Sequence, residues 1–491
     1  MVSPDLATYE MLYNDHDVVP VFREMSVDYD TPVSLFDKVA SGDYAFLLES
    51  LEGGERWGRY SFIGFRPFLL VKIRGRKIFL EDRDGSRVQE VGNPLDFLHG
   101  LMKQFKMADI QGLPRFSGGA VGYLGYDMVR FVERLPDLLP DTTGFHDSVF
   151  MFPEVLLCVD NLKQSLKIIV NTLSDPQRSP KDVYDKACSI IEGVIRKIRR
   201  GIDYPEPEMG NISHTRLEPE VPKERFEEIV ERAKEYIRAG DIIQVVLSQR
   251  FSGRSKIPPF ELYRSVRRIN PSPYLYYLKL GDEVLVGSSP EILVRLTGEE
   301  IELRPIAGTR PRGKTKQEDS DLERELLRDP KEKAEHVMLV DLGRNDVGRV
   351  AEMGSVKVKD FMVIERYSHV MHIVSSVTGR LKKGLDMFDV FKACFPAGTV
   401  SGAPKIRAME IIEELEHARR GPYAGAVGYL GFSGSMDLAI AIRTLCQKAD
   451  MLYLQAGAGI VADSVPENEW TETLNKGRAL MRAIEDVQTR S

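Results

Sequence analysis

The sequence predicts an α/β protein of the α+β type, with antiparallel β-sheets covered by helices. Runs rich in β-branched and aromatic residues are joined by short turns, as neighbouring antiparallel strands are. These runs lie at 274–280, 283–289, 291–296 and 369–379. Helical patterns occur among them, without the regular alternation that a parallel sheet requires. The length of 491 residues favours two domains or one large composite domain over a single ordinary core.

A polar stretch with four prolines, at 199–224, divides the chain. Its composition is typical of a linker or a long surface connection. We therefore expect an N-terminal region at 1–205 and a C-terminal domain at 215–491.

Directly after this stretch, apolar residues recur at helical spacing from Phe226 to Ile237. This pattern predicts an amphipathic helix that ends at Gly240. The run IIQVVLSQ, at 242–249, then predicts a strand.

One segment occurs twice, as GAVGYLGYD at 119–127 and as GAVGYLGFS at 425–433. We interpret the repeat as two similar strands whose glycines permit close packing, rather than as a duplicated functional site. Both halves of the chain are then expected to contribute comparable strands to one sheet system.

The composition excludes several classes of function. With 67 basic and 74 acidic residues the net charge is −7, which argues against nucleic acid or an anionic membrane surface as the main partner. The first residues are acidic, and no apolar run is long enough to span a membrane. The four cysteines are widely spaced in apolar surroundings, which indicates free thiols in a reducing compartment. We expect a soluble, cytoplasmic protein.

Two stretches predicted as helices each carry two glutamates three residues apart, and therefore on one helix face. The pairs are Glu332 with Glu335, in 331–346, and Glu469 with Glu472, in 467–484. If the two faces met, they would form the all-oxygen site that Mg²⁺ prefers. Two solvated helix faces explain the same pattern, and spacing alone does not show that the pairs meet.

Several other residues are suited to holding an anion. Gly457 and Gly459, after a predicted strand, would let backbone N–H groups approach a ligand, although a tight turn explains them equally. Arg443 lies among apolar residues, where it would bind either an anionic ligand or a buried carboxylate. Thr399 and Ser401 precede a helix expected near Pro404, so N-capping is their simplest role.

Five motifs occur in order across 304–470: RPIAGTRPRG, AEHVMLVDLGRND, FPAGTVSGAPK, YAGAVGYLGF and QAGAGIVADSVPENEW. Together they resemble the chorismate-utilising enzymes, and more closely the anthranilate synthase component I family. The segments FLLESLEGGERWGRYSFIG (46–64) and RINPSPYLYYL (268–278) extend the resemblance over nearly the whole chain. It implies stacked antiparallel sheets flanked by helices, with chorismate and Mg²⁺ bound in the C-terminal half.

The resemblance also implies roles for individual residues. Glu335 and Glu472 correspond to Mg²⁺ ligands, with Glu332 and Glu469 supporting them through water. The residues implied to bind chorismate are Gly308, Thr309, Tyr423, Arg443, Gly457, Ala458, Gly459 and Lys476. The catalytic candidates are Glu291, which would protonate the departing C4 hydroxyl, His372, which would support pyruvate elimination, and Thr399. The arginine-flanked loop at 304–313 is expected to close on the dianionic substrate.

Two positions concern the nucleophile. Relatives that form aminodeoxychorismate commonly carry a lysine nucleophile at the position of Ala307, and relatives that add water carry a lysine base at that of Gln244. This chain has neither lysine, so the resemblance implies ammonia, supplied by a separate glutaminase subunit in a heterotetramer of two synthase and two glutaminase subunits. An aminodeoxychorismate synthase without the lysine is the nearest alternative. A silent sensor of tryptophan or chorismate is disfavoured, because Glu291, Glu335 and Glu472 are all present.

The segments LLES (47–50) and NPSPY (270–274) read locally as a strand end and a proline turn. By resemblance they form a pocket for L-tryptophan as a feedback inhibitor. The residues implied for this pocket are Glu49, Ser50, Arg59, Pro273, Tyr274 and Leu275.

Overall fold

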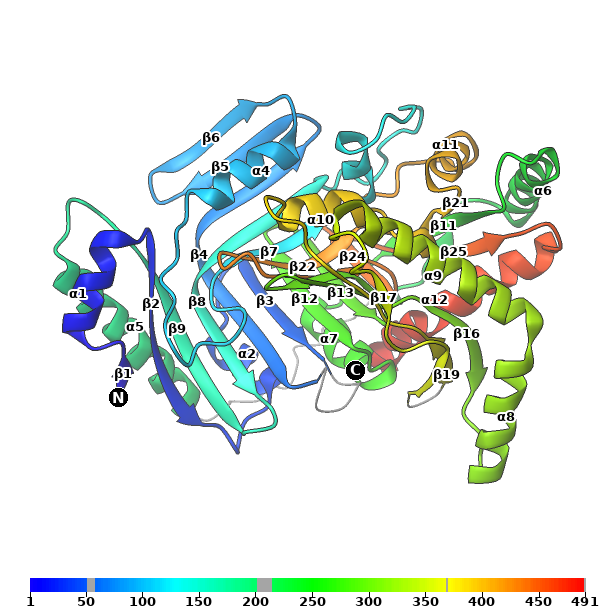
Figure 1. Cartoon of the computed structure of the whole chain (residues 1–491). Coiled ribbons are helices and arrows are strands. Elements are labelled where there is room, and N and C mark those ends of the chain that lie inside the picture. The colour runs from blue at the N-terminus through cyan, green and yellow to red at the C-terminus, as the bar shows by residue number, and fades with distance from the viewer. Residues whose placement is uncertain (51–57, 201–213, 368–369, 490–491) are drawn as a thin grey trace.

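Apart from a small separate sheet, the described strands form one continuous curled network that is folded into two layers (Figure 1). The computed structural model describes residues 1–50, 58–200, 214–367 and 370–489. The first layer contains β1 (Val2–Ser3), β2 (Val18–Ser26), β3 (Tyr44–Glu49), β9 (Ser165–Leu173), β10 (Glu218–Pro219), β11 (Gln244–Arg254), β12 (Tyr274–Leu280), β13 (Glu283–Ser289), β21 (Gly402–Ala403), β24 (Thr444–Lys448) and β25 (Met451–Ile460). The second contains β5 (Lys77–Asp82), β6 (Gly85–Glu90), β7 (Gly119–Leu124), β14 (Ile292–Thr297), β15 (Glu300–Leu303), β17 (Lys357–Val358), β20 (Val377–Arg380), β22 (Ala426–Gly431) and β23 (Met436–Ile440).

Two long strands, β4 (Tyr60–Arg74) and β8 (Ser148–Asp160), belong to both layers. They pair with each other, with a break in register between Pro67 and Leu69. Before this break β4 also pairs with β3, and after it with β5. β8 likewise pairs with β7 through its first half and with β9 through its second. The two layers are therefore halves of one antiparallel system, which confirms the predicted fold class.

A small third sheet lies beside the two layers and consists of β16, β18 and β19. Its strands are β16 (Ile306–Pro311), β18 (Val363–Arg366) and β19 (Val370–Val374). The helices are α1 (Leu6–Asp15), α2 (Pro32–Val39), α4 (Pro94–Lys103), α5 (Pro180–Arg199), α6 (Lys223–Ala239), α7 (Pro259–Ile269), α8 (Lys316–Arg328), α9 (Pro330–Val350), α10 (Met387–Cys394), α11 (Lys405–Leu415) and α12 (Pro466–Thr489), with 3-10 turns η1 (Tyr126–Phe131) and η2 (Gly398–Val400).

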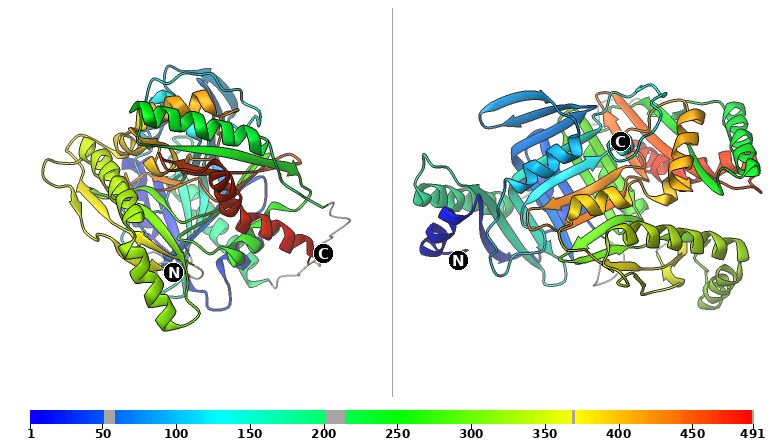
Figure 2. Two further views of the ribbon diagram at one scale, coloured as in Figure 1. Left: turned by 90° about the vertical axis from the view of Figure 1, so that its right-hand side faces the viewer. Right: turned by 45° about the horizontal axis from the view of Figure 1, so that its top comes forward.

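Buried aromatic and aliphatic side chains fill the space between the layers. Phe62 of the first layer packs edge-on against Tyr429 of the second, with ring centroids 6.2 Å apart. The outer face of the first layer is covered by α1, α2, α5, α7 and α12, and that of the second by α4, α9 and α10. Helices α6 and α11 cover β11 and β25, while α8 packs on the small sheet. Figure 2 shows α1 and α5 together at one end of the molecule, with α6 and α8 toward the other.

The repeated segments form two neighbouring strands of the second layer. β7 and β22 pair antiparallel, with Gly122 opposite Gly428. A Cβ at Gly122 would overlap the Val149 carbonyl oxygen, and one at Gly428 would overlap that of Asp437. The glycines therefore permit close strand packing, as expected, and both halves of the chain contribute strands to one sheet.

Most predicted elements agree with the structure. Helix α6 ends at Gly240, which has the left-handed φ of 85° that glycine tolerates without strain. The run 369–379, however, is not one strand. β19 ends at Val374 and β20 begins at Val377, in a different sheet, because the backbone N–H of Ser375 turns to Pro305 and that of Ser376 to Asp360.

The predicted linker at 199–224 is only partly described, since 201–213 lie outside the described residues. Its last part is ordered, because β10 pairs with β11 and α6 begins at Lys223. Strands from both sides of this stretch are interleaved: β3 pairs with β12, and β7 with β22. The division into 1–205 and 215–491 stays a prediction.

All four cysteines are free thiols, as expected. None of the helices within the described ranges is long and apolar enough to cross a membrane.

Candidate functional site

A cavity of about 200 Å³ lies where the small sheet, α9 and α12 meet β11 and β25. Many of the residues selected from the sequence line it. They are Glu291, Thr309, Glu335, His372, Thr399, Tyr423, Arg443, Gly457 and Lys476, together with Gln244 and Ala307. The structure thus brings the catalytic candidates, half of the proposed metal ligands and most of the substrate-binding candidates together around one cavity.

Glu291 enters the cavity at the residue before β14, and its side chain is buried. Burial raises the pKa of this carboxyl to about 8, while the Thr399 hydroxyl and the charge of Lys476 act in the opposite direction. The carboxyl is therefore protonated at neutral pH, as a general acid must be. Thr399 Oγ1 is itself buried and has no hydrogen bond of normal geometry to another described residue, so it is available to a ligand.

Arg443 supplies a positive charge that is not neutralised by a carboxylate. Its Nη1 donates to the Lys476 carbonyl oxygen at 2.8 Å, and within the described ranges it makes no ion pair. Burial lowers the pKa of this guanidinium, with Tyr423 and Glu472 acting against the shift. A buried cation with free donors is costly unless an anion binds there, so the substrate-binding interpretation fits better than a structural ion pair.

His372 is held in one orientation by β16. Its Nδ1 donates to the Gly308 carbonyl oxygen at 3.0 Å and also lies 3.0 Å from Thr309 Oγ1. Burial lowers the pKa of His372, and the nearby charge of Arg443 adds to this. A neutral ring that donates through Nδ1 leaves Nε2 as an acceptor, which suits a residue that takes up a proton.

Three substrate-binding candidates adjoin the cavity without lining it: Gly308, Ala458 and Gly459. The Gly308 carbonyl oxygen binds His372 instead. Ala458 is fully buried in the cluster beneath α6 and α11. A Cβ at Gly459 would lie 2.5 Å from Nε2 of Gln244, so this glycine makes room for a cavity residue.

The two glutamate pairs come together across α9 and α12. Burial raises the pKa of Glu335, and the negative charges of Glu332 and Glu472 raise it further. The pKa of Glu469 is also raised, by burial and then by the charge of Glu472. Lys476 partly offsets this charge, since its Nζ lies 2.7 Å from Glu472 Oε1 and 2.8 Å from the Gly457 carbonyl oxygen.

This donor set fits a divalent cation. Mutually repelling carboxylates with raised pKa values are stabilised by Mg²⁺, which prefers oxygen ligands. In the described part of the chain, no three acidic, histidine or cysteine side chains already converge closely enough to hold a metal. Glu332 is bonded to Arg310 at 3.2 Å and Glu472 to Lys476, so the carboxylates would need to exchange these partners for the cation.

The loop at 304–313 reaches the cavity, but its three arginines are paired with carboxylates of the chain and are absent from the cavity lining. Arg304 pairs with Glu365, and Arg312 with Asp319 at 2.8 Å. Arg310 binds three carboxylates of α8 and of the turn and helix that follow it: Glu325, Asp329 and Glu332, at 2.9–3.2 Å. These arginines hold the loop against neighbouring elements, while Ala307 and Thr309, between them, line the cavity.

N-capping by Thr399 and Ser401 is also not observed. Helix α11 begins after Pro404, which makes no side-chain cap. Thr399 lies instead on the short turn η2, and Ser401 Oγ donates to the Ala397 carbonyl oxygen at 2.8 Å. Thr399 is thereby freed for the cavity.

Sequence analysis missed Gln455, which lines the cavity and donates through Nε2 to Ser248 Oγ at 2.8 Å. Alternation along β25 could have identified it, because residues 455, 457 and 459 share one strand face.

The proposed tryptophan-binding segments form a second cavity, of about 60 Å³. Of the six implied residues, Glu49, Ser50, Pro273, Tyr274 and Leu275 line it. The register explains this, because β3 pairs with β12 so that Leu275 lies opposite Glu49. Tyr274 Oη donates to Asp437 at 2.9 Å, and Arg295 binds the same carboxylate at 2.9 Å.

Two of the six side chains are turned elsewhere. Arg59 is absent from the lining and donates to Asp160 at 2.8–3.3 Å. The Glu49 carboxylate accepts from Tyr263, and from Arg267 at 2.9 Å. Both carry bonds to other residues, so Glu49 lines the cavity while paired with Arg267, and Arg59 lies outside its lining. The part of the matching segment at 51–57 lies outside the described residues.

A wider cavity of about 780 Å³ adjoins the other two. It shares Thr309, His372 and Arg443 with the first cavity, and Pro273 with the second. Pro273, in the turn at 270–273, therefore lies between the wide cavity and the second cavity.

Comparisons with known proteins agree with this geometry. The family described as chorismate binding enzyme matches residues 45–482. The chain is 49% identical to anthranilate synthase component 1 of Acetivibrio thermocellus, over 99% of both chains, and 50% identical to that of Aquifex aeolicus, over 96% of both. The solved structure of anthranilate synthase component I from Streptococcus pneumoniae superimposes with a TM-score of 0.77 at 40% identity, covering 93% of this chain and 98% of that one. The menaquinone-specific isochorismate synthase of Escherichia coli, at 19% identity and a TM-score of 0.70 over 98% of this chain and all of that one, shares the fold.

Proposed function

The chain belongs to the anthranilate synthase component 1 family of chorismate-binding enzymes, and from this premise we propose how it acts. It is the synthase subunit that converts chorismate and ammonia into anthranilate and pyruvate, a lyase reaction that is the first step of tryptophan biosynthesis. The alternative of an aminodeoxychorismate synthase is not favoured, because the curated relatives at this identity are named anthranilate synthase.

The observation that carries the mechanism is the absence of a lysine nucleophile. Ala307 and Gln244 line the same cavity as Glu291, at the two positions where lysine would serve as nucleophile or base. Among the described residues that line this cavity, Lys476 is the only lysine, and its Nζ is bound to Glu472 and to the Gly457 carbonyl oxygen. The nucleophile therefore comes from outside the chain, as ammonia.

The residues of the cavity divide the reaction between them. Arg443 and Tyr423 provide donors for the substrate carboxylates, and Thr399 lies beside Glu291 as a catalytic candidate. Glu291 protonates the C4 hydroxyl, which leaves as water while ammonia attacks C2. In the second stage the C2 proton is lost and the C3–O bond breaks, so that the ring becomes aromatic. The enolpyruvyl group leaves as enolpyruvate, which takes up a proton at its methylene carbon to become pyruvate. In this proposal His372, which is neutral, supports the elimination by accepting the C2 proton.

Mg²⁺ belongs to this proposal as the cation held by Glu335 and Glu472, with Glu332 and Glu469 supporting it through water. When bound, it would supply the positive charge that fixes the ring carboxylate. The raised pKa values of Glu335 and Glu469 support this, because burial first and neighbouring carboxylates second disfavour their charged forms, which a bound cation would stabilise.

The partners of the chain are also part of this proposal. Ammonia would come from a separate glutaminase subunit, in a heterotetramer of two synthase and two glutaminase subunits. L-Tryptophan would inhibit by binding the cavity between Ser50 and Pro273. The four free thiols support a cytoplasmic location.

One assay tests the central claim. Purified chain is mixed with chorismate, Mg²⁺ and ammonium, and anthranilate fluorescence is followed while the products are identified by mass spectrometry. Anthranilate with pyruvate supports the proposal. A product that retains the enolpyruvyl group would identify an aminodeoxychorismate synthase, and absence of turnover would favour the sensor.

A further inference from the structure

Arg420 is a buried cation that neither lines the substrate cavity nor was selected from the sequence. Its side chain is 1% exposed and that of its partner Glu416 is 2% exposed. Arg420 donates to both oxygens of Glu416, at 2.6 and 3.0 Å. Its remaining donors bind two backbone carbonyl oxygens, of Val400 at 2.7 Å and of Val246 at 2.8 Å.

Both carbonyl groups belong to residues that line the substrate cavity. Val246 lies on β11, and Val400 is the last residue of η2, directly after Thr399. One planar guanidinium therefore joins the strand wall of the cavity to the turn that carries Thr399. Arg420 also lies over the ring of Tyr423, 5.6 Å from its centroid.

The rest of the network keeps this guanidinium in place. Glu416 also accepts from the backbone N–H and the hydroxyl of Ser248, each at 2.8 Å. Ser248 Oγ in turn accepts from Gln455, another cavity residue. A buried ion pair is a poor source of stability, because desolvation of both charges offsets their attraction. Fixing a specific geometry is the role that this network fits better.

We propose that Arg420 is a positioning residue, which holds η2 against β11 so that Thr399 stays beside Glu291. The inference rests on the proposed function, because it concerns the geometry in which Glu291 protonates chorismate. Arg420 acts through Thr399 and touches no substrate atom.

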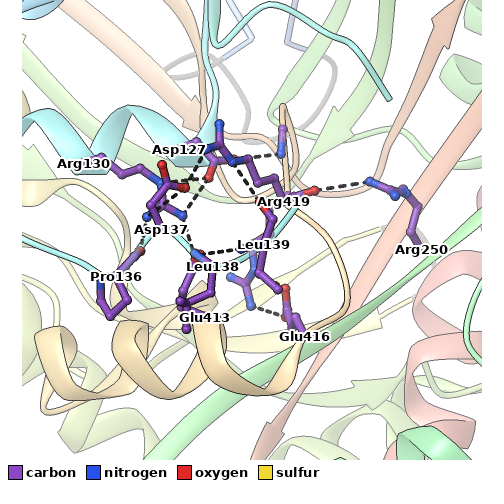
Figure 3. Close-up of polar contacts among 12 residues, drawn as sticks. Asp127, Arg130, Pro136, Asp137, Leu138, Leu139, Arg250, Glu413, Glu416 and Arg419 are labelled. Carbon is purple, nitrogen blue, oxygen red and sulfur yellow. Dashed lines mark hydrogen bonds and ion pairs between the residues drawn. The ribbon is translucent and has the colours of Figure 1, made fainter. Parts of the chain in front are cut away.

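The neighbouring Arg419 offers a matched control. Arg419 directly precedes Arg420 in the segment after α11. Its Nη2 binds Asp137 at 2.6 Å, and its Nε binds the Leu139 carbonyl oxygen at 3.2 Å (Figure 3). The Glu413 carboxylate binds the segment that contains Asp137 and Leu139, because it accepts hydrogen bonds from the backbone N–H groups of Leu138 and Leu139. These contacts attach residues 137–139 to the end of α11, and neither Arg419 nor Glu413 lines the cavity.

The first experiment compares Arg420→Lys with Arg419→Lys. Lysine keeps the charge next to Glu416 and Tyr423 but cannot bridge Val246, Val400 and Glu416 at once. For Arg420→Lys we expect kcat with saturating chorismate and ammonium to fall about 10- to 100-fold, with KM changed less, because a small displacement of a reacting group is costly. Arg419→Lys should keep the wild-type kcat. An unchanged kcat in Arg420→Lys would overturn the inference.

A double-mutant cycle tests whether Arg420 acts through Thr399. In a Thr399→Val background, Arg420→Lys should have little further effect on kcat, because the group that it positions is already gone. Equal losses in both backgrounds would show that Arg420 acts by another route and would also overturn the inference.

If Arg420→Lys does not fold, the double variant Glu416→Gln/Arg420→Gln replaces it. That variant leaves no unpaired buried charge, and circular dichroism checks its fold. We expect it to fold and to lose kcat as Arg420→Lys would. If neither variant folds, Arg420 is required for the stability of the fold and the positioning role is overturned. The wild type is the reference throughout: if it makes no anthranilate, the proposed function itself fails.

Discussion

Gly457 leaves room for the hydroxyl of Tyr423, since a Cβ at position 457 would lie 2.7 Å from Tyr423 Oη. Both residues line the substrate cavity, and burial raises the pKa of Tyr423 to about 12, so its hydroxyl stays protonated as a donor. The close approach of β25 to this hydroxyl therefore shapes the site.

Gly457→Ala should weaken chorismate binding. The backbone of Gly457 lies outside the left-handed region, so the added methyl group meets the Tyr423 hydroxyl first and the Leu247 carbonyl oxygen, at 3.1 Å, second. We expect KM for chorismate to rise about tenfold, equivalent to about 1.4 kcal/mol of lost binding. Steady-state kinetics measure this. In a Tyr423→Phe background the added methyl group should cost much less, and an equal cost there would contradict the explanation.

Activity should depend on pH through Glu291. Because its pKa is raised to about 8, the carboxyl is protonated and able to act as an acid below that pH, and this ability is lost as the pH rises above it. With the concentration of NH₃ itself held constant, kcat should be level near neutrality and fall above about pH 8. Glu291→Gln should be inactive over the whole range. A rate that keeps rising through pH 9 at constant NH₃ would exclude Glu291 as the acid.

Magnesium binding should depend on both glutamate pairs. Glu335→Gln and Glu472→Gln should each abolish turnover at saturating Mg²⁺ and leave the fold intact. In the wild type, Mg²⁺ should also raise the melting temperature, because a ligand that binds the native state stabilises it. Each variant should lose this increase. Normal activity or a normal increase in either variant would remove that residue from the ligands.

The sequence predicted those site residues whose pattern involves only neighbouring positions in the chain. Helical spacing identified Glu335 and Glu472 on their faces, because the period of an α-helix is a local property. The direction of Arg310 could not be predicted in this way, because its carboxylate partners include side chains on α8 and α9, and the packing of these helices against β16 decides which charges meet. Arg420 was missed for the same reason, since Val246 and Val400 lie in distant parts of the sequence.

The source of ammonia gives a further prediction. The isolated chain should form anthranilate from ammonium salts and not from glutamine, because the described residues that line the cavity include no cysteine or serine that could hydrolyse glutamine. Since NH₃ and not NH₄⁺ attacks, the rate at fixed total ammonium should rise with pH until Glu291 loses its proton. Glutamine-dependent product from rigorously purified chain would contradict the two-subunit proposal.

Tryptophan inhibition should act through the turn at 270–273. Pro273 of this turn lines both the small cavity beside Ser50 and the wide cavity that contains Arg443 and His372. The turn is also bonded to β13, because Ser272 Oγ lies 2.8 Å from Ser288 Oγ. Ser288 in turn donates its backbone N–H to the Arg443 carbonyl oxygen at 3.1 Å. A ligand that moves this turn is thus connected to a substrate-binding arginine.

We therefore expect L-tryptophan to weaken chorismate binding by a coupling free energy of about 1–3 kcal/mol, or roughly 5- to 150-fold in affinity. Ser50→Phe should relieve this inhibition, because the ring would fill the small cavity while leaving the catalytic residues untouched. Titration of tryptophan against both proteins, at a fixed chorismate concentration well below KM, measures the effect, and uninhibited kcat and KM serve as the control for Ser50→Phe. Equal inhibition of the two proteins would place the effector elsewhere, and a wild type that tryptophan does not inhibit would mean that this cavity has no regulatory role.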